Sequence, residues 1–425
     1  MTLRAAVFWL KDFLLLGKMK FAYSQIEKGI KTGKENIEQR EALLEWAKRE
    51  VPYYRQYKDC SFEQLPVVNK SIIKDGGDNF KADFWKGKTL HKETTSGSTG
   101  TPFEVVQDPG KRKRAQADSL YMSDFAGFHL GTRLYYIRVW NNLNKKSRLK
   151  TLLTNIVMQS SDNLSDDSLE AFLRQLENDH QEKSILAYAS SLTALYQWMK
   201  RTGRKTTAKV ACFITMSESF PDDAREGLKE LFGCPVVSRY SDQECGLISQ
   251  QCALGTEYHI NTASFYVEIL DLDKDVPVED GRLGRIVVTD LYNRAMPLIR
   301  YDTGDLGVMS HECECGYHGK VLKRVEGRRV DFITATNGNL LSPVTIINAM
   351  WEYNDLLQWQ FVQHAEGEFE MKLNCSTSPY AREAEMLKDI KGYVGDDARI
   401  KITYVDEIPL LASGKRKCVL NAIKK

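Results

Sequence analysis

The run TTSGSTGTP at residues 94–102 combines residue types that can hold a phosphate. Glycine permits a positive φ, so that successive backbone N–H groups can turn toward an anion, and Ser and Thr hydroxyls add further donors. A flexible linker has a similar composition. The run is short, however, and the strand-like segment PFEVVQD overlaps its end. No GK[ST] follows, so it is not a Walker A loop. This stretch alone leaves both interpretations open.

Three other short segments carry side chains suited to nucleotide chemistry. YDTGDLG at 301–307 places Asp305 after an expected Thr-Gly turn, where its carboxylate could accept two hydrogen bonds from a ribose diol. RYSDQECG at 239–246 places Glu244 in an expected loop, where it could bind Mg²⁺. PLLASGKRK at 409–417 offers the Lys415 ammonium to a developing anion. Taken singly, these are also typical of a hairpin turn, a surface Glu and a solvated Lys.

The order of these segments resembles the adenylate-forming, acyl-CoA synthetase-like superfamily over most of the chain. The matching series is TSGSTGTP, Tyr240 with Glu244, YDTGD, Gly-Arg at 327–328 and PxxxxGK near the end. LLEWAKREVPYYRQY followed by LPVVNKSIIKD is similar to the phenylacetate–CoA ligase branch, and within it to members found with capsular-polysaccharide biosynthesis.

The resemblance implies a ligase in which a carboxylate attacks the α-phosphate of ATP and pyrophosphate leaves. The acyl group then passes to coenzyme A. Glu244 would bind Mg²⁺, and Lys415 would neutralise charge during adenylation. The β- and γ-phosphates would lie against Thr94, Thr95, Ser96, Gly97, Ser98, Thr99 and Gly100. Adenine would lie against the segment 216–219, with Ser217, Glu218 and Ser219, and against Arg239, Tyr240 and Ser241. Asp305 and Arg328 would hold the ribose.

The chain departs from the family pattern at several positions. Phe103 stands where the phosphate loop is usually followed by Lys, and Ser241 replaces a Gly. Val330 occupies a hinge position that often carries Asp, with Asp331 one residue later, and TATNGNLL at 334–341 replaces a Gly-rich loop. The main catalytic groups remain, so these departures bear on the rate and on the position of the hinge.

The element pattern predicts an α/β and α+β protein of more than one domain. Strand and helix patterns alternate before residue 259, which favours a parallel or mixed sheet covered by helices. Closely spaced strands from 259 predict a β-rich subdomain, and 331–425 predicts a compact α+β unit. The resemblance implies an AMP-binding domain at 1–328, a hinge at 329–331 and a small mobile domain at 332–425 that carries Lys415.

The composition and charge bear on the classes of partner that the protein could bind. The 425 residues have a net charge of +2, which gives no sign of nucleic-acid binding. We expect KRKR at 111–114 to be a solvated helix face. VFWLKDFLLLG is too short to span a membrane. It predicts an amphipathic helix packed on the domain, with membrane-surface contact as the alternative. Nine scattered cysteines and no cleavable signal predict the cytoplasm, and a homodimer is compatible with the sequence.

Four soft or borderline ligands form a candidate zinc site. Cys252 and His259 lie in CALGTEYH, and Cys313 and Cys315 lie in HECECGYH. Together they suit a closed tetrahedral Zn²⁺ site, with His311 and His318 as competing ligands. Relatives in the branch have a similar arrangement, which favours structural zinc over unrelated buried thiols.

The sequence therefore leaves three functions open: an acid–CoA ligase, a ligase whose acceptor is an amine or sugar-linked group, and a nucleotide-binding protein without turnover. Lys415 and Glu244 argue against the third. We expect the acyl pocket to be lined by residues 135–140, Tyr188 and residues 214–218, although aromatic side chains there also suit a core.

Overall fold

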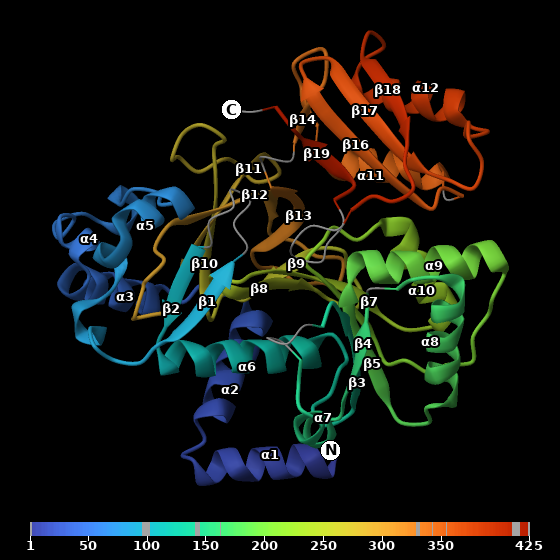
Figure 1. The fold of residues 1–425 in the computed structure, drawn as a ribbon. Helices are drawn as coiled ribbons and strands as arrows, with labels where there is room; N and C mark the ends of the chain where they lie inside the picture. Colours follow the sequence, from blue (N-terminus) through green and yellow to red (C-terminus); the bar gives the residue numbers. More distant parts are fainter. Residues whose placement is uncertain are drawn as a thin grey trace.

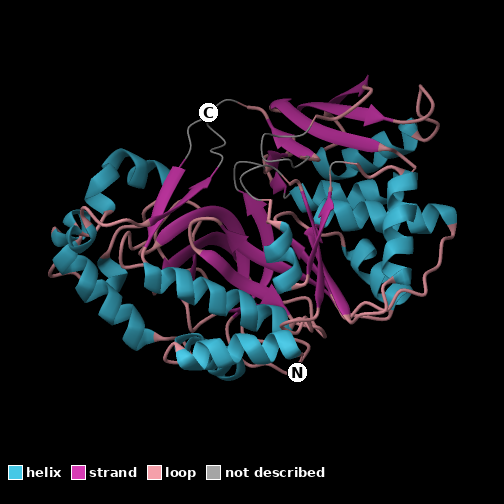
Figure 2. Cartoon of the chain, turned by 60° about the horizontal axis from the view of Figure 1, so that its bottom comes forward, coloured by secondary structure: helices cyan, strands magenta, loops and turns pink. Residues whose placement is uncertain are grey.

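The large sheet is the centre of the molecule. The computed structural model describes residues 2–95, 103–140, 145–161, 163–328, 332–341, 343–353, 355–409 and 417–423. Within them, eleven strands form one mixed sheet in the order β10-β11-β12-β13-β9-β8-β7-β6-β5-β3-β4. Helices lie on the outside of this twisted sheet (Figure 1, Figure 2). The mixed α/β architecture predicted from the alternation of elements is confirmed.

The half of the sheet from β4 to β7 is parallel, as strand–helix alternation requires. Its strands carry buried apolar runs, and helices α8, α9 and α10 cover them with the apolar sides of their own patterns. The elements are β3 (Arg133–Arg138), α7 (Arg148–Thr154), β4 (Ile156–Ser160), α8 (Asp166–Asn178), β5 (Lys183–Tyr188), α9 (Ala189–Thr202), β6 (Phe213–Met216), α10 (Asp222–Phe232) and β7 (Val236–Asp242).

The other half of the sheet is antiparallel and forms the expected β-rich region. Its strands are β8 (Gly246–Gln251), β9 (Tyr258–Ile260), β10 (Phe265–Leu270), β11 (Leu283–Asp290), β12 (Tyr301–Ser310) and β13 (Val321–Arg328). The Thr-Gly turn expected in YDTGDLG is wrong. Residues 303–305 instead bulge from β12 opposite Ile286, and Gly304 takes φ +79° there.

The N-terminal elements lie mainly against the antiparallel half of the sheet, and α1 also contacts α7 of the parallel half. They are α1 (Leu3–Leu14), α2 (Lys18–Thr32), α3 (Ile37–Glu50), α4 (Pro52–Arg55), α5 (Lys70–Gly76), the antiparallel pair β1 (His91–Thr95) and β2 (Phe103–Gln107), and α6 (Pro109–Phe125). The first apolar segment is a helix, but the expected packing of its apolar side on the domain is wrong, because Ala5 is the one residue of α1 that is buried. No helix among the described residues is long and apolar enough to cross a membrane.

The C-terminal unit has its own sheet and its own core. Four strands pair in the order β18-β17-β16-β19, and the core residues run from Ile333 to Val419. The unit lies apart from the N-terminal helices, at the top of Figure 1. Its elements are β14 (Ile333–Thr334), β15 (Leu340–Leu341), α11 (Pro343–Ala349), β16 (Gln358–Ala365), β17 (Glu368–Asn374), α12 (Glu383–Val394), β18 (Arg399–Tyr404) and β19 (Val419–Asn421).

Candidate active site and metal cluster

Tyr240 and Asp305 meet where the parallel and antiparallel halves of the sheet join. Tyr240 lies on β7, and its hydroxyl donates to Asp305 Oδ2 at 2.9 Å. The same hydroxyl lies 3.1 Å from Thr303 Oγ1, and Thr303 donates to the carbonyl of Ile286 opposite the bulge. The bulge in β12 therefore aims Thr303 and Asp305 at Tyr240. Burial raises the pKa of Tyr240, so its hydroxyl stays protonated and can donate.

Glu244 lies in the tight connection between β7 and β8, and it is 2% exposed. Its Oε1 lies 2.5 Å from the ammonium of Lys70, on α5, and 3.5 Å from the hydroxyl of Tyr301. The surface position that a lone Glu in a loop suggests is therefore wrong. Lys70 also lies over the ring of Phe103, 5.8 Å from its centroid. Sequence reasoning missed Lys70, although its segment NKSIIKD had been singled out.

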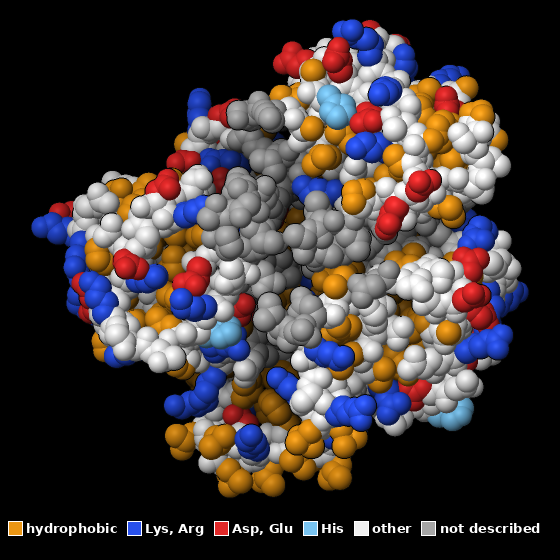
Figure 3. Space-filling view, in the orientation of Figure 1, with side chains coloured by type: hydrophobic (Ala, Val, Ile, Leu, Met, Phe, Trp, Pro, Cys, Tyr) orange, Lys and Arg blue, Asp and Glu red, His pale blue; other side chains and the backbone are white. Residues whose placement is uncertain are grey.

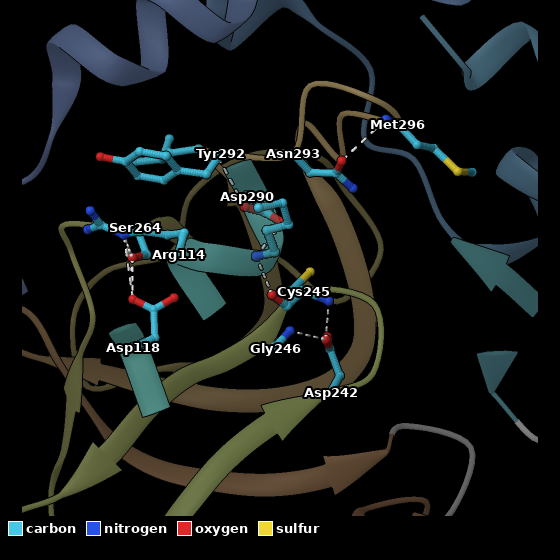
Figure 4. Close-up of polar contacts among 12 residues, drawn as sticks. Arg114, Asp118, Asp242, Cys245, Gly246, Ser264, Asp290, Tyr292, Asn293 and Met296 are labelled. Carbon is cyan, nitrogen blue, oxygen red and sulfur yellow. Dashed lines mark hydrogen bonds and ion pairs between the residues drawn. The ribbon is translucent and has the colours of Figure 1, made fainter. Parts of the chain in front are cut away.

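Asp242 is a second carboxylate that the sequence analysis missed. Its Oδ1 accepts from the backbone N–H groups of Cys245, at 2.5 Å, and Gly246, at 3.3 Å, which shapes the connection (Figure 4). Its Oδ2 is buried without a hydrogen-bond partner among the described residues. Burial, with the charge of Glu244 beside it, raises the pKa of Asp242 to about 7. Two carboxylates with an unpartnered oxygen suit a hard divalent cation, so the residues fit Mg²⁺.

A buried ion pair holds the other side of this connection. The ammonium of Lys111, on α6, lies 2.6 Å from Asp290 Oδ2 and donates to the carbonyl of Cys245 at 2.5 Å. Burial alone would lower the pKa of Lys111, but the carboxylates of Asp290 and Asp118 outweigh it and raise that pKa. Farther along α6, Arg114 donates to Ser264, which donates to Asp118 (Figure 4). The expectation that residues 111–114 form a solvated face is thus wrong for Lys111 and Arg114.

The residues assigned to adenine lie at the carboxyl ends of neighbouring parallel strands, where ligands of such sheets bind. Ser217 follows β6 and takes φ +73°, a conformation that is costly without glycine. Ser217 and Ser219 are exposed, and Glu218 accepts from the N–H of Ser190 at 2.9 Å. Ser241 is also exposed.

Arg239 is placed differently from Tyr240. It donates to Gln250, at 2.6 Å, and to Ser123, at 2.8 Å, so its guanidinium contacts α6 and β8. Burial lowers the pKa of Arg239 to about 10. Successive side chains of a strand point to opposite faces, so Arg239 and Tyr240 do not line one face together.

The remaining nucleotide residues are only partly described. Thr94 and Thr95 end β1, and Thr95 pairs with Phe103, but Ser96, Gly97, Ser98, Thr99 and Gly100 lie outside the described residues. Arg328 is described through its backbone, which pairs with Asp305 in the β12–β13 ladder. Lys415 and the hinge 329–331 also lie outside. Both flanks of the segment 410–416 are held on β16, because Ile408 donates to Gln358 and Gln360 donates to the carbonyl of Lys417.

The expected acyl-pocket residues divide between two faces of β3. Tyr135 is a core residue, and its hydroxyl donates to Asp179 at 2.8 Å. Tyr136 points the other way, with Trp140 at 5.2 Å between ring centroids and Met216 Sδ at 4.0 Å from its hydroxyl. Arg138 lies over both rings, and its Nε is buried without a partner among the described residues.

The four predicted zinc ligands come together. One ligand atom each from Cys252, His259, Cys313 and Cys315 lies within 4.8 Å of every other. The sulfurs of Cys252 and Cys313 are 3.7 Å apart, and Cys315 Sγ is 3.5 Å from His259 Nε2. Zn–S bonds of about 2.3 Å at the tetrahedral angle would place two sulfurs about 3.8 Å apart. The spacing therefore fits Zn²⁺.

The surroundings of this cluster also suit a metal. Burial lowers the pKa of His259 to about 4, which leaves the imidazole neutral, as a ligand must be. The N–H of Gly255 donates to Cys252 Sγ at 3.1 Å. Of the competing ligands, His311 instead pairs with Asp280 at 3.0 Å, and His318 is exposed. The cluster ties the β8–β9 turn to the β12–β13 turn.

Comparison with known proteins extends these observations. Residues 333–422 match the family model of the CapK C-terminal domain. The protein CapK of Staphylococcus aureus is 23% identical over 377 residues, which cover 86% of this chain and 81% of CapK. A phenylacetate–coenzyme A ligase of Thermus thermophilus is 29% identical over 224 residues, 47% of each chain.

The fold matches that of a solved ligase over nearly the whole chain. A crystal structure of 2-hydroxyisobutyryl-CoA ligase with 2-HIB-AMP, in the postadenylation state, superposes with a TM-score of 0.67 at 16% identity. The match covers 93% of this chain and 91% of the ligase. By sequence, this chain is thus similar to CapK and to a phenylacetate–coenzyme A ligase, and it shares the fold of 2-hydroxyisobutyryl-CoA ligase.

Proposed function

We propose that the protein uses ATP to convert a carboxylic acid to an acyl-adenylate, releasing pyrophosphate, and then transfers the acyl group to coenzyme A. The observation that carries this proposal is the contact of Tyr240 with Asp305 at the join of the two half-sheets, with the backbone of Arg328 beside Asp305 and Glu244 buried in the β7–β8 connection. Tyr240 and Arg328 are 88 residues apart in the sequence, and unrelated structural roles would not require these residues to converge.

Each group has a role in this reaction. Asp305 and Arg328 would hold the ribose, and the loop between β1 and β2 would hold the β- and γ-phosphates. Glu244, with Asp242 beside it, would bind Mg²⁺, which supplies positive charge to the phosphates. Lys415 would neutralise the α-phosphate and the attacking carboxylate. Adenylation is a displacement at phosphorus, so positioned positive charge is the main requirement.

Lys70 extends this set. Phe103 stands where the family pattern has a Lys, and the ammonium of Lys70 lies over that ring and against Glu244. In our proposal, this ammonium would pair with a phosphate oxygen in place of the missing Lys once Mg²⁺ and ATP are bound. The charge would then come from α5 and not from the phosphate loop.

The acid would lie against the face of β3 that carries Tyr136, opposite the core formed with α8 and α9. Tyr136 and Trp140 offer ring faces, and Arg138 offers a guanidinium N–H with no partner among the described residues. An aromatic acid with a polar or anionic substituent suits this lining.

The test is ATP–pyrophosphate exchange with a panel of acids, with aryl acids that differ in one polar substituent at its centre. We expect exchange that requires both an acid and Mg²⁺. Lys70→Met should lower it about 100-fold. Lys74→Met, exposed on the same helix, should leave it unchanged. No exchange with any acid would instead support a nucleotide-binding protein without turnover.

The alternative is that a group other than coenzyme A accepts the acyl group. Residues 333–422 match the CapK C-terminal domain. The family resemblance implies that this domain moves and opens the path for the acceptor. An amine or sugar-linked group in polysaccharide assembly would then take the acyl group. Loss of the free thiol of coenzyme A during turnover supports the thioester, whereas adenylate that persists with coenzyme A supports this alternative.

We also propose that Cys252, His259, Cys313 and Cys315 hold a structural zinc ion. With four protein ligands the site would be closed, so the metal would stabilise two turns and take no part in the reaction. All nine cysteines are free, as a reducing cytoplasm would keep them, and we propose that compartment for the protein.

A further inference from the structure

The N-terminal end of the molecule exposes an unusually apolar surface. Leu3, Val7, Leu10 and Leu14 repeat on one side of α1, and that side faces outward. Apolar side chains from the α1–α2 turn, α2 and α7 continue it. We call this set the apolar patch. Its members are each 59–83% exposed: Leu3, Val7, Leu10, Phe13, Leu14, Leu15, Leu16, Phe21, Leu149, Leu152 and Leu153. Orange side chains gather along the bottom of Figure 3, where α1 lies in Figure 1.

The helix is held in this orientation by its inner side. Thr2 caps α1 by accepting from the N–H of Ala5 at 3.1 Å, and it donates to the carbonyl of Leu130 at 3.2 Å. At the other end, Asp12 accepts from the N–H groups that begin α2, at 2.8 and 2.9 Å. Trp9 packs edge-on against Tyr23. The apolar patch is therefore a fixed surface of the fold.

Helices α1 and α7 form one surface. The guanidinium of Arg4 donates to the carbonyl of Leu152 at 3.4 Å, and a Cβ placed on Gly131 would meet Thr2 and Arg4. The leucines of α7 thus continue the patch, although they are more than 130 residues away in the sequence. A contiguous apolar area of this kind marks an interaction site.

Basic residues surround the apolar patch. Residues 2–21 and 145–154 together carry eight Lys or Arg against one Asp, in a chain whose net charge is only +2. That Asp, Asp12, is engaged by the backbone of α2. Most of the basic side chains are exposed: Arg4, Lys11, Lys18, Lys20, Lys145, Arg148 and Lys150. Apolar side chains within a basic rim complement an anionic lipid surface.

We propose that the apolar patch binds the surface of a bilayer that contains anionic lipids. A helix of 12 residues is about 18 Å long, and the hydrocarbon core of a bilayer is about 30 Å thick, so α1 would lie in the interface and not cross it. A second copy of the chain fits less well, because a two-fold contact would set one basic rim against the other. The C-terminal unit lies at the opposite end of the molecule (Figure 1) and would face the aqueous side.

The experiment is flotation of the full-length protein with vesicles of phosphatidylglycerol and phosphatidylcholine in equal amounts. We expect binding to these vesicles and much weaker binding to phosphatidylcholine alone. Leu10→Glu with Leu14→Glu should reduce binding at least about tenfold, because apolar area no longer enters the interface. Each of Lys145→Gln, Arg148→Gln and Lys150→Gln should reduce it about fivefold. Leu357→Glu, a leucine 65% exposed in the C-terminal unit, is the matched control and should bind like the unchanged protein.

Two further measurements keep the result interpretable. The variants should retain the thermal unfolding curve of the unchanged protein, since the altered side chains are exposed. Sedimentation velocity should show no change in oligomeric state between the unchanged protein and the double variant. Failure of the unchanged protein to bind anionic vesicles would overturn the proposal. So would an oligomer that the double variant dissociates, since the patch would then join copies of the chain.

Discussion

Lys111 and Lys113 belong to one basic run, and the fold gives them opposite environments. Lys111 is fully buried against Asp290, whereas Lys113 is exposed. The buried residues of α6 repeat at helical spacing and include Lys111, Arg114 and Asp118, so charged residues occupy positions where apolar ones would mark the inner side. The partner carboxylate is 179 residues later, a distance that no local pattern spans. Glu244 and Lys70 could not be paired for the same reason.

This contrast gives a prediction. Lys111→Met should lower the free energy of unfolding by about 3–5 kcal/mol, because it leaves the Asp290 carboxylate buried without its counter-charge. Lys113→Met should change it by less than about 0.5 kcal/mol. Urea denaturation of both variants provides the measurement.

The double variant Lys111→Met with Asp290→Leu is the check on this explanation. It should recover part of the lost stability, because it removes both charges together. If the double variant were as unstable as the sum of the two single variants, the loss would come from packing around α6.

Helices and strands were predicted correctly where a single hydrophobic period, that of a helix or that of a strand, dominated the segment. The apolar runs ILAYAS and CPVVSRYS became β5 and β7, and the segment 221–232 became α10. YDTGDLG failed because Thr and Gly are typical of a turn, whereas pairing with β11 and β13 keeps the chain extended and displaces the extra residues into a bulge. The first helix was predicted, but its packing was not, because amphipathicity shows that an apolar face exists and not what covers it.

The zinc proposal belongs to this scale, because the four ligands join two turns. We expect the purified protein to contain about one zinc ion per chain, and Cys315→Ser to remove it and lower the midpoint of thermal unfolding. Cys375→Ser, a partly exposed cysteine of the C-terminal unit, should change neither the metal content nor the midpoint.

If zinc stabilises the two turns, the zinc content and the midpoint of thermal unfolding must fall together. Chelation of zinc should lower the midpoint of the unchanged protein and leave that of Cys315→Ser as it was. A protein that contains no zinc when purified under reducing conditions would remove the proposal, and the four side chains would then be a cluster of buried thiols and an imidazole.

At the scale of the whole molecule, the element pattern predicted a compact α+β unit at residues 331–425. The structure gives this unit a hydrophobic core of its own. The separate core is what allows a unit to move as a body. Its position relative to the large sheet could not be predicted, because hydrophobic patterning specifies which residues are buried within a unit and leaves the contact between units open. Residues 329–331 stay a predicted hinge.

If this unit rotates between adenylation and acyl transfer, one substitution should impair only adenylation and another should impair only the transfer. Lys415→Ala should lower acid-dependent ATP–pyrophosphate exchange by about 100- to 1,000-fold, because the charge on the α-phosphate loses its counter-ion. The same variant should still form thioester from a synthetic acyl-adenylate and coenzyme A. Asp331→Pro restricts φ at the hinge, so it should retain exchange and slow the transfer to coenzyme A. Rapid-quench measurement of each half-reaction on both variants gives four rates. A single fixed arrangement of the two units predicts that each variant slows both steps alike, so an equal loss of exchange and transfer in Asp331→Pro would contradict the rotation.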